Sequence, residues 1–298
     1  MRIGLVLPMA TGDIERVLAF ARRAEDLRFD GLFAFDHLFS PGAPSDRPNL
    51  EAYATLAAVA SSTSRVTVGT LVTRASLRSA GMLAKQAVTL DDVSGGRFVL
   101  AIGTGDAVGR AEHEVFGLRY LAPTIRREHL AQTVRALRAL FGGEPWPGGE
   151  HVPPIDGALL PASRTPGGPR IWVGGKSEGA VRVAAREADG WNGWGLAAPV
   201  FADRARLLAS EAEGRAVEPT WGGAVVVGDD AAHADRMIAD RRARGLGQAW
   251  AGSADRATAW LAELRDAGAT WAILLAAGPA DRVELIAERM LPSFRKTA

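Results

Sequence analysis

The segment VTVGTLVTRASLRSAGMLAKQAVTLDDVSGGRFVLAIG (residues 66–103) contains the unit that decides the fold. Its first and last runs, 66–72 and 98–103, are rich in Val, Leu, Ile and Phe, as buried parallel strands are. The residues between them, 81–93, have apolar positions at helical spacing. A strand, a helix and a second strand in this order predict a right-handed crossover in a parallel sheet.

The same alternation continues through the chain and predicts the fold class. The predicted strands are 2–7, 31–35, 66–72, 98–103, 170–173, 190–194, 223–227 and 271–275. The predicted helices are 13–27, 50–63, 81–93, 125–141, 179–188, 202–214, 232–245, 255–267 and 280–295, with one extra helix before the last strand. We therefore expect an α/β protein, a single (β/α)8 TIM barrel spanning residues 1–298. A doubly wound open sheet is the alternative.

Residues 142–169 interrupt the alternation of strands and helices, because they are rich in Gly and Pro. We interpret them as one long insertion after the fourth helix. It starts at the end of the barrel opposite the active site, so it is either an exposed connector or a segment that climbs the side of the barrel to cover the mouth.

Composition excludes several classes of protein. The 35 basic and 34 acidic residues give a net charge of +1, and the arginines are scattered, which argues against a nucleic-acid partner. The absence of cysteine excludes disulfides and thiolate metal sites, and His113 and His129 are too far apart to form a metal site on one helical face. No apolar run is long enough for a membrane span, and residues 2–10 are interpreted as the first strand rather than an export signal, so we expect a cytoplasmic protein.

Three motifs follow predicted strands, where barrel enzymes place their active-site groups. Asp36-His37 follows the second strand, and His37 is a candidate proton donor or acceptor, or else an ordinary loop histidine. Gly103-Thr104-Gly105-Asp106 closes the fourth strand, where the glycines allow close approach of a ligand and Asp106 is either a site residue or a cap.

The third motif is Gly174-Gly175-Lys176-Ser177, which opens a predicted helix. Free amides, the positive end of the helix, a lysine and a hydroxyl together make a phosphate site, although a tight turn with a serine cap would look the same. Two further clusters have simpler explanations. Trp191, Asn192 and Trp194 are more typical of packing at the rim, and Glu112-His113-Glu114 is typical of a solvated helix face.

Several short motifs occur together in a fixed order over essentially the whole chain. They are Gly4-Leu5 with Pro8, Asp36-His37, Val68-Gly69-Thr70, Leu83-Ala84-Lys85, Thr89-Leu90-Asp91, Ser94-Gly95-Gly96-Arg97, Gly103-Thr104-Gly105, residues 169–175 and 188–192, and Leu291-Pro292-Ser293-Phe294. In this order and spacing, the sequence resembles the luciferase-like monooxygenase family. Members use either reduced flavin mononucleotide (FMN) with oxygen or the deazaflavin coenzyme F420 for hydride transfer, and Asp36-His37 with Gly-Thr-Gly-acid resembles the F420 branch.

The resemblance implies roles for individual residues. The coenzyme phosphate would lie on Gly174, Gly175, Lys176 and Ser177, the ring would lie near Asp36 and His37, and Gly103, Thr104 and Gly105 would approach it. A non-proline cis peptide is expected within Thr70, Leu71 and Val72. The sugar-phosphate dehydrogenases of the family have a glutamate in place of Asp106, which argues against a sugar-phosphate substrate.

The function that we predict is F420-dependent hydride transfer to or from a small organic substrate, with His37 and Asp106 as the catalytic candidates and no metal. The alternatives are a two-component monooxygenase that takes reduced FMN from a separate reductase, a non-catalytic flavin-binding or deazaflavin-binding protein, and a hydrolytic barrel that uses Asp36 and Asp106. Relatives also lead us to expect a homodimer.

Overall fold

The structure is a computed structural model that describes residues 1–39, 48–105, 109–157 and 161–295. Its parallel strands follow one another around a closed sheet, because β8 pairs with β7 on one side and β10 on the other, and β10 pairs with β1. The eight barrel strands are β1 (Arg2–Val6), β2 (Gly31–Ala34), β3 (Thr67–Thr70), β5 (Phe98–Gly103), β6 (Arg170–Gly174), β7 (Gly190–Trp194), β8 (Glu218–Gly228) and β10 (Trp271–Ala276). The TIM barrel is therefore confirmed, and the open sheet is excluded.

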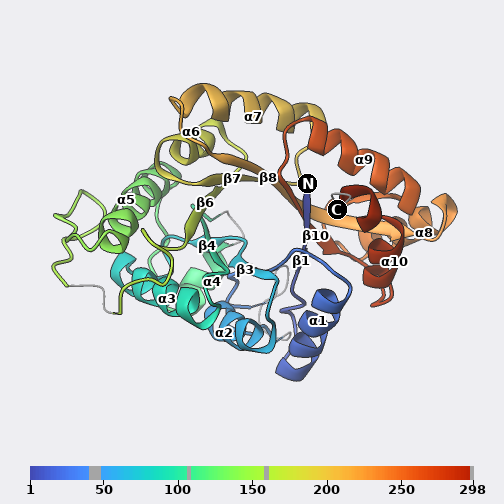
Figure 1. Cartoon of the computed structure of the whole chain (residues 1–298), viewed down its shortest axis with the longest axis horizontal. Coiled ribbons are helices and arrows are strands. Elements are labelled where there is room, and N and C mark those ends of the chain that lie inside the picture. Colours follow the sequence, from blue (N-terminus) through green and yellow to red (C-terminus); the bar gives the residue numbers. More distant parts are fainter. Residues whose placement is uncertain (40–47, 106–108, 158–160, 296–298) are drawn as a thin grey trace.

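Helices form the outer ring around these strands (Figure 1). They are α1 (Ile14–Asp26), α2 (Ala52–Ser62), α3 (Ala80–Val93), α4 (Gly109–Val115), α5 (Pro123–Phe141), α6 (Glu178–Glu187), α7 (Ala198–Glu211), α8 (Ala231–Ala243), α9 (Ala254–Asp266) and α10 (Arg282–Arg289). The last predicted helix is shorter than expected: α10 gives way to a 3-10 turn, Leu291–Phe294, at Pro292, whose nitrogen has no hydrogen to donate. None of the helices in the described part of the chain is long and apolar enough to cross a membrane.

Aromatic side chains fill the barrel interior below its mouth. The ring of Phe33 stacks on Trp172 at 5.8 Å and meets Trp271 edge-on at 5.7 Å. All three side chains are buried, and Gly31 leaves room for two of them: a Cβ there would lie 2.9 Å from both Phe33 and Trp271. Because the interior is packed, a ligand must bind at the end of the barrel.

Three elements were not predicted. The expected strand 66–72 ends at Thr70, and after a cis peptide between Leu71 and Val72 the chain resumes as β4 (Thr73–Arg74), which pairs with β5. The predicted non-proline cis bond is thus confirmed. A short strand, β9 (Trp250–Ser253), pairs with the far half of β8, and neither β9 nor the seven-residue α4 has enough apolar positions to show a period.

The described part of the insertion, 142–157 and 161–169, is held against the side of the barrel. Ile155 lies beside Gly81, at the end of α3 that is nearer the mouth: a Cβ on Gly81 would be 3.6 Å from the Ile155 side chain. Val152 is buried beside Ala80. The carboxylate of Asp91, at the opposite end of α3, accepts hydrogen bonds from the Thr165 amide at 2.7 Å and from the hydroxyls of Ser163 and Thr165 at 2.6 and 2.8 Å. The insertion therefore climbs the barrel wall toward the mouth.

Replacement of the fully buried Asp91 tests this attachment. Because Asp91→Ala removes the acceptor of three hydrogen bonds, we expect a loss of about 2–3 kcal/mol in the free energy of unfolding. Limited proteolysis should also become faster within 142–169. The neighbouring Asp92→Ala is the control, since the Asp92 side chain is exposed and its ion pair with exposed Arg164 is long, at 3.5 Å. Equal protease sensitivity of the two variants would contradict the assignment.

Candidate functional site

The mouth of the barrel has an apolar floor. Phe35, Val72, Trp194 and Leu275 are partly buried and pack against the aromatic cluster inside the barrel. The rings of Phe35 and Trp194 meet edge-on with centroids 5.3 Å apart. Phe35 and Val72 follow β2 and β3, whereas Trp194 and Leu275 lie at the ends of β7 and β10. The floor is therefore built from several sides of the barrel and offers a surface on which a planar ring can lie.

The bulge after β3 builds the middle of this floor. The side chain of Val72 lies over two glycines of the neighbouring strands: a Cβ at Gly103 would lie 2.8 Å from Val72 Cγ2, and a Cβ at Gly174 would lie 2.6 Å from Val72 Cγ1. The two glycines thus make room for Val72, which in turn is exposed in part at the mouth. Thr70 fixes the bulge to β5, because its hydroxyl donates to the Ala101 carbonyl at 2.7 Å.

His37 stands at the edge of the mouth and is held by a buried carboxylate. Its Nδ1 lies 2.6 Å from Glu112 Oε1, and Glu112 Oε2 accepts the Leu38 amide at 2.7 Å. The Glu112 side chain is fully buried, whereas that of His37 is 22% exposed. Since an ionised carboxylate can only accept, Nδ1 carries a proton, and in the neutral ring Nε2 keeps a lone pair. Within the described residues, Nε2 has no hydrogen-bond partner.

Arg74 compensates the negative charge of Glu112. Its guanidinium forms an ion pair with Glu112 Oε2 and also donates to the carbonyls of Asp36 at 3.2 Å and Gly109 at 3.3 Å. Burial alone would raise the pKa of Glu112, but hydrogen bonds from His37 and Leu38 and the charge of Arg74 hold this pKa below its ordinary value. Glu112 is therefore an anion that fixes the orientation of His37.

The solvated-face interpretation of Glu112-His113-Glu114 is wrong for two of its three residues. Glu112 and His113 are buried, and only Glu114 is exposed. His113 Nδ1 lies 2.7 Å from the Gly109 carbonyl oxygen, and its Nε2 lies 3.0 Å from the Ser76 hydroxyl. A helix as short as α4 gives no periodic signal for its buried side. The sequence feature that could have indicated a buried acid was Arg74, because a cation at the end of a buried strand needs an anion beside it.

Asp36 has a structural partner. Both of its oxygens accept from Arg78, at 2.6 and 3.1 Å, and Arg78 also donates to Glu51 at 2.6 Å and lies over the Tyr53 ring. Burial and the charge of Asp36 raise the pKa of Tyr53, so Tyr53 stays a neutral phenol. Asp36 thus holds the loop that carries His37.

The predicted phosphate motif follows β6 and opens α6. Ser177 is the N-cap, accepting from the Ala180 amide at 3.3 Å, and both Lys176 and Ser177 are exposed. The Gly175 amide donates to the Asn192 carbonyl at 3.0 Å, and the Trp191 indole donates to the Gly175 carbonyl at 2.8 Å. Buried Trp191 is thus a packing residue, as expected, and it holds this turn in place.

A second cation lies beside the same helix end. A Cβ at Gly179, in the first turn of α6, would lie 3.0 Å from the side chain of Arg127, which reaches over from α5. A helix start flanked by Lys176 and Arg127 fits a phosphate group. Gly105 has φ +70°, and its carbonyl accepts from Arg126 at 3.0 Å. Asp106, the second catalytic candidate, lies outside the described residues.

No group of three or more His, Asp or Glu side chains is placed to hold a metal ion in the ranges that the structure describes. The mouth therefore combines an apolar floor, an oriented histidine and a cationic helix end.

Comparison with known proteins identifies the family. A family model described as luciferase-like monooxygenase matches residues 1–290. This chain belongs to the luciferase-like monooxygenase family. An F420-dependent hydroxymycolic acid dehydrogenase of Mycobacterium tuberculosis is 31% identical over 78% of this chain and 64% of its own length. An F420-dependent glucose-6-phosphate dehydrogenase of Microbacterium testaceum is 29% identical over 59% of this chain and 51% of its own length. The matches thus span about half to two thirds of these relatives.

Solved structures share the fold at low sequence identity. An F420-dependent secondary alcohol dehydrogenase in complex with an F420-acetone adduct has a TM-score of 0.85 at 18% identity, covering 99% of both chains. A monooxygenase from Streptomyces bottropensis has a TM-score of 0.76 at 21% identity, covering 99% of this chain and 100% of its own. An F420-dependent dehydrogenase and a monooxygenase thus both share the fold of this chain.

The Glu112 ion pair should be visible in acid unfolding. The pKa of Glu112 is lower in the folded state than in the unfolded state, where it is about 4.3. Ionised Glu112 therefore stabilises the fold fully at pH values above the unfolded pKa, and this stabilisation is lost as the pH falls through the folded-state pKa. Glu112→Gln leaves Arg74 buried without its counter-charge, so we expect a loss of about 3 kcal/mol near pH 7. The difference from the wild type should shrink below about pH 4.

Urea unfolding at a series of pH values measures this difference. Glu114→Gln is the matched control, because Glu114 is on the same helix and exposed. A difference between Glu112→Gln and the wild type that does not change with pH would contradict an ionised, charge-paired Glu112.

Proposed function

We propose that this protein is a coenzyme F420-dependent oxidoreductase that interconverts an alcohol and a carbonyl compound. The observation that carries the proposal is the His37–Glu112 pair at the mouth, with Nδ1 at 2.6 Å from a buried carboxylate and Nε2 without a partner in the described residues. Interconversion of an alcohol and a carbonyl requires one proton to leave or reach the substrate oxygen, and an oriented imidazole performs this transfer near neutral pH. The names of the F420-dependent relatives support the same choice.

The residues present fit a deazaflavin with a phosphorylated side chain. The floor made by Val72 and its neighbours is apolar and partly exposed, which suits one face of a flat ring. The start of α6, with Lys176 and Arg127 beside it, suits a phosphate. When bound, F420 would accept or supply the hydride.

The protein's own contribution is proton transfer and orientation. In the oxidation direction, His37 Nε2 takes the hydroxyl proton, and the resulting imidazolium keeps its Nδ1 hydrogen on Glu112. The buried negative charge stabilises this cation, and Arg74 keeps Glu112 ionised throughout. In the reduction direction, the same imidazolium returns the proton to the carbonyl oxygen.

Two of the alternatives meet obstacles in the geometry. A hydrolytic barrel built on Asp36 and Asp106 would need Asp36 as a free acid or base, but both of its oxygens are engaged by Arg78. A non-catalytic coenzyme carrier would have no use for an imidazole anchored on a buried carboxylate. Formation of a homodimer, and the need for a separate reductase in the FMN reaction, stay predictions.

Oxygen dependence separates hydride transfer from monooxygenation. We expect the purified protein to reduce F420 at the expense of a secondary alcohol under strictly anaerobic conditions, with an equal amount of ketone formed and no oxygen consumed when air is admitted. Absorbance of the oxidised deazaflavin and an oxygen electrode measure the two quantities. Turnover only with reduced FMN and oxygen would make the protein a monooxygenase and overturn the proposal.

Substitution at His37 and Glu112 tests the proton route. His37→Ala should lower kcat by about 10²–10⁴-fold while the dissociation constant for F420 stays within about twofold. Glu112→Gln should lower kcat by about 10–100-fold and move the pH–rate profile for alcohol oxidation to lower pH, because the imidazolium loses its stabilising charge. Glu114→Gln serves as the control. A pH–rate profile that does not move would contradict the role of Glu112 as a positioning residue.

A further inference from the structure

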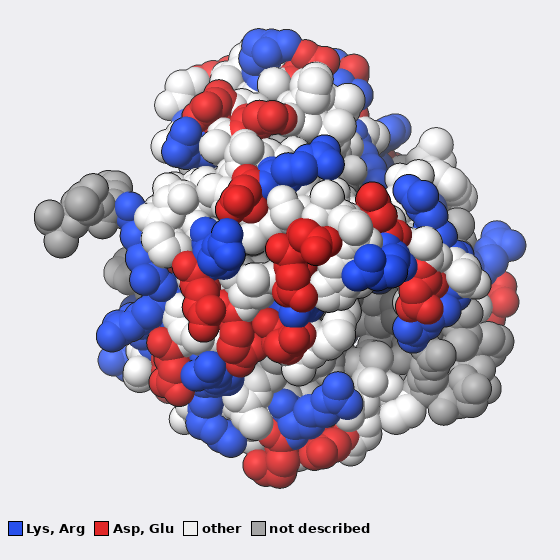
Figure 2. All heavy atoms as spheres, turned by 90° about the vertical axis from the view of Figure 1, so that its right-hand side faces the viewer, with Lys and Arg blue, Asp and Glu red and all other residues white. Residues whose placement is uncertain are grey.

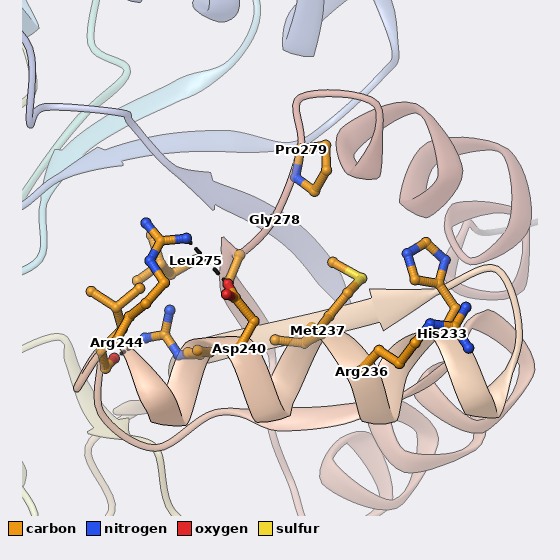
Figure 3. A pocket seen from close by; sticks show the side chains of 12 residues that line it. His233, Arg236, Met237, Asp240, Arg244, Leu275, Gly278 and Pro279 are labelled. Carbon is orange, nitrogen blue, oxygen red and sulfur yellow. Dashed lines mark hydrogen bonds and ion pairs between the residues drawn. The ribbon is translucent and has the colours of Figure 1, made fainter.

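A cavity of about 700 Å³ lies beside the mouth, between α8 and the segment that follows β10. Figure 3 shows the side chains of His233, Met237 and Asp240 on the side of α8 that faces Gly278 and Pro279, and Arg244 follows at the end of the helix. The volume is that of a typical small-molecule site. None of the residues in the mouth described above lines it except Leu275.

The floor of the cavity is apolar and continuous with the mouth. Val226 of β8 and Leu275 of β10 contribute to it, together with Met237 from α8. Leu275 also packs against the aromatic cluster inside the barrel, as Phe35 and Trp194 do. A molecule that binds in the mouth beside His37 can therefore extend over Leu275 into this cavity and remain in contact with apolar side chains along the way.

The wall made by α8 is strongly basic. Arg236, Arg241 and Arg244 all line the cavity. Arg241 donates to the carbonyls of Leu246 and Gly247, and burial and the nearby charge of Arg244 lower its pKa. The Arg236 side chain makes no hydrogen bond or ion pair with any residue that the structure describes.

Among the described residues that line the cavity, Asp240 is the only acid, and it pairs with Arg244 at 3.2 Å. Both side chains of the pair are more than half exposed, so the pair is weak and can open. Elsewhere on the face that carries α8, α9 and α10, basic and acidic side chains interleave (Figure 2). The excess of arginine at the cavity is therefore local rather than a property of the whole face.

We propose that this cavity binds an anionic group, a carboxylate or a phosphate, at the far end of an otherwise apolar substrate whose reacting carbon lies in the mouth. Arg244 and Arg241 are the principal contacts, and Arg236 adds to the positive potential. The identity of this ligand as a substrate rests on the proposed function, whereas its binding to the cavity does not. The arrangement selects substrates that carry an acidic group on an apolar chain, since Leu275 and Val226 accommodate the chain and the arginines its charge.

Binding of simple probes tests the cavity without coenzyme. Octanoate, octyl phosphate and octanol share one apolar chain and differ only in the head group. We expect the wild-type protein to bind at least one of the two anions about tenfold more tightly than octanol in isothermal titration calorimetry, and the preferred anion tells carboxylate from phosphate. Equal affinity for octanol and both anions would overturn the proposal.

Variants on α8 locate the site. Arg244→Gln should weaken binding of the preferred anion about tenfold, and Arg244→Lys should recover most of the loss. Asp240→Asn should strengthen binding severalfold, because it frees Arg244 from its internal partner. Arg242→Gln is the matched control: Arg242 is in the last turn of the same helix, carries the same charge and does not line the cavity.

The outcomes separate this proposal from the proposed function. If Arg242→Gln weakens anion binding as much as Arg244→Gln, or if Asp240→Asn has no effect, the cavity is not the site and the inference is wrong. If the anion binds as expected but F420 is neither bound nor reduced, the proposed function fails while the anion site stands.

Discussion

The buried ion pair between Arg74 and Glu112 is the interaction on which the site depends. A carboxylate with no exposure is tolerated only where charge and hydrogen bonds compensate it, and here Arg74, the Leu38 amide and His37 supply them. Arg74 lies in β4, His37 and Leu38 lie in the loop after β2, and Glu112 itself lies in α4. One buried charge thus fixes the relative positions of three segments and orients the imidazole at the mouth.

The path of the chain after β3 makes this ion pair possible. The bulge at Leu71 and Val72 moves β4 onto β5, so that Arg74 points under the loop of His37. Gly105 and Gly109 leave the space that the Arg74 side chain occupies, since a Cβ at either would lie within 2.7 Å of it. The same bulge places Val72 over Gly103 and Gly174. It therefore both forms the floor of the mouth and positions Arg74 to pair with Glu112, which holds His37.

Much of this architecture could be predicted from the sequence, because long strands and helices have periodic patterns. All eight barrel strands, the cis bond within 70–72 and the position of His37 after β2 were predicted. Glu112 was not, because α4 has only seven residues and a charged triplet in it is usually solvated. The engagement of Asp36 by Arg78 and the basic cavity on α8 depend on tertiary packing between distant segments, for which no local pattern exists.

Equilibrium binding of the coenzyme decides whether the mouth of the barrel is built for F420 or for FMN. Purified protein would be titrated anaerobically with F420, with oxidised FMN and with reduced FMN, and binding would be followed by ligand or tryptophan fluorescence. We expect tight binding of F420, at least tenfold weaker binding of either form of FMN, and weaker F420 binding in a Lys176→Ala variant, because the proposed phosphate site lies at the start of α6. Preference for reduced FMN, or binding of none of the three, would contradict this expectation.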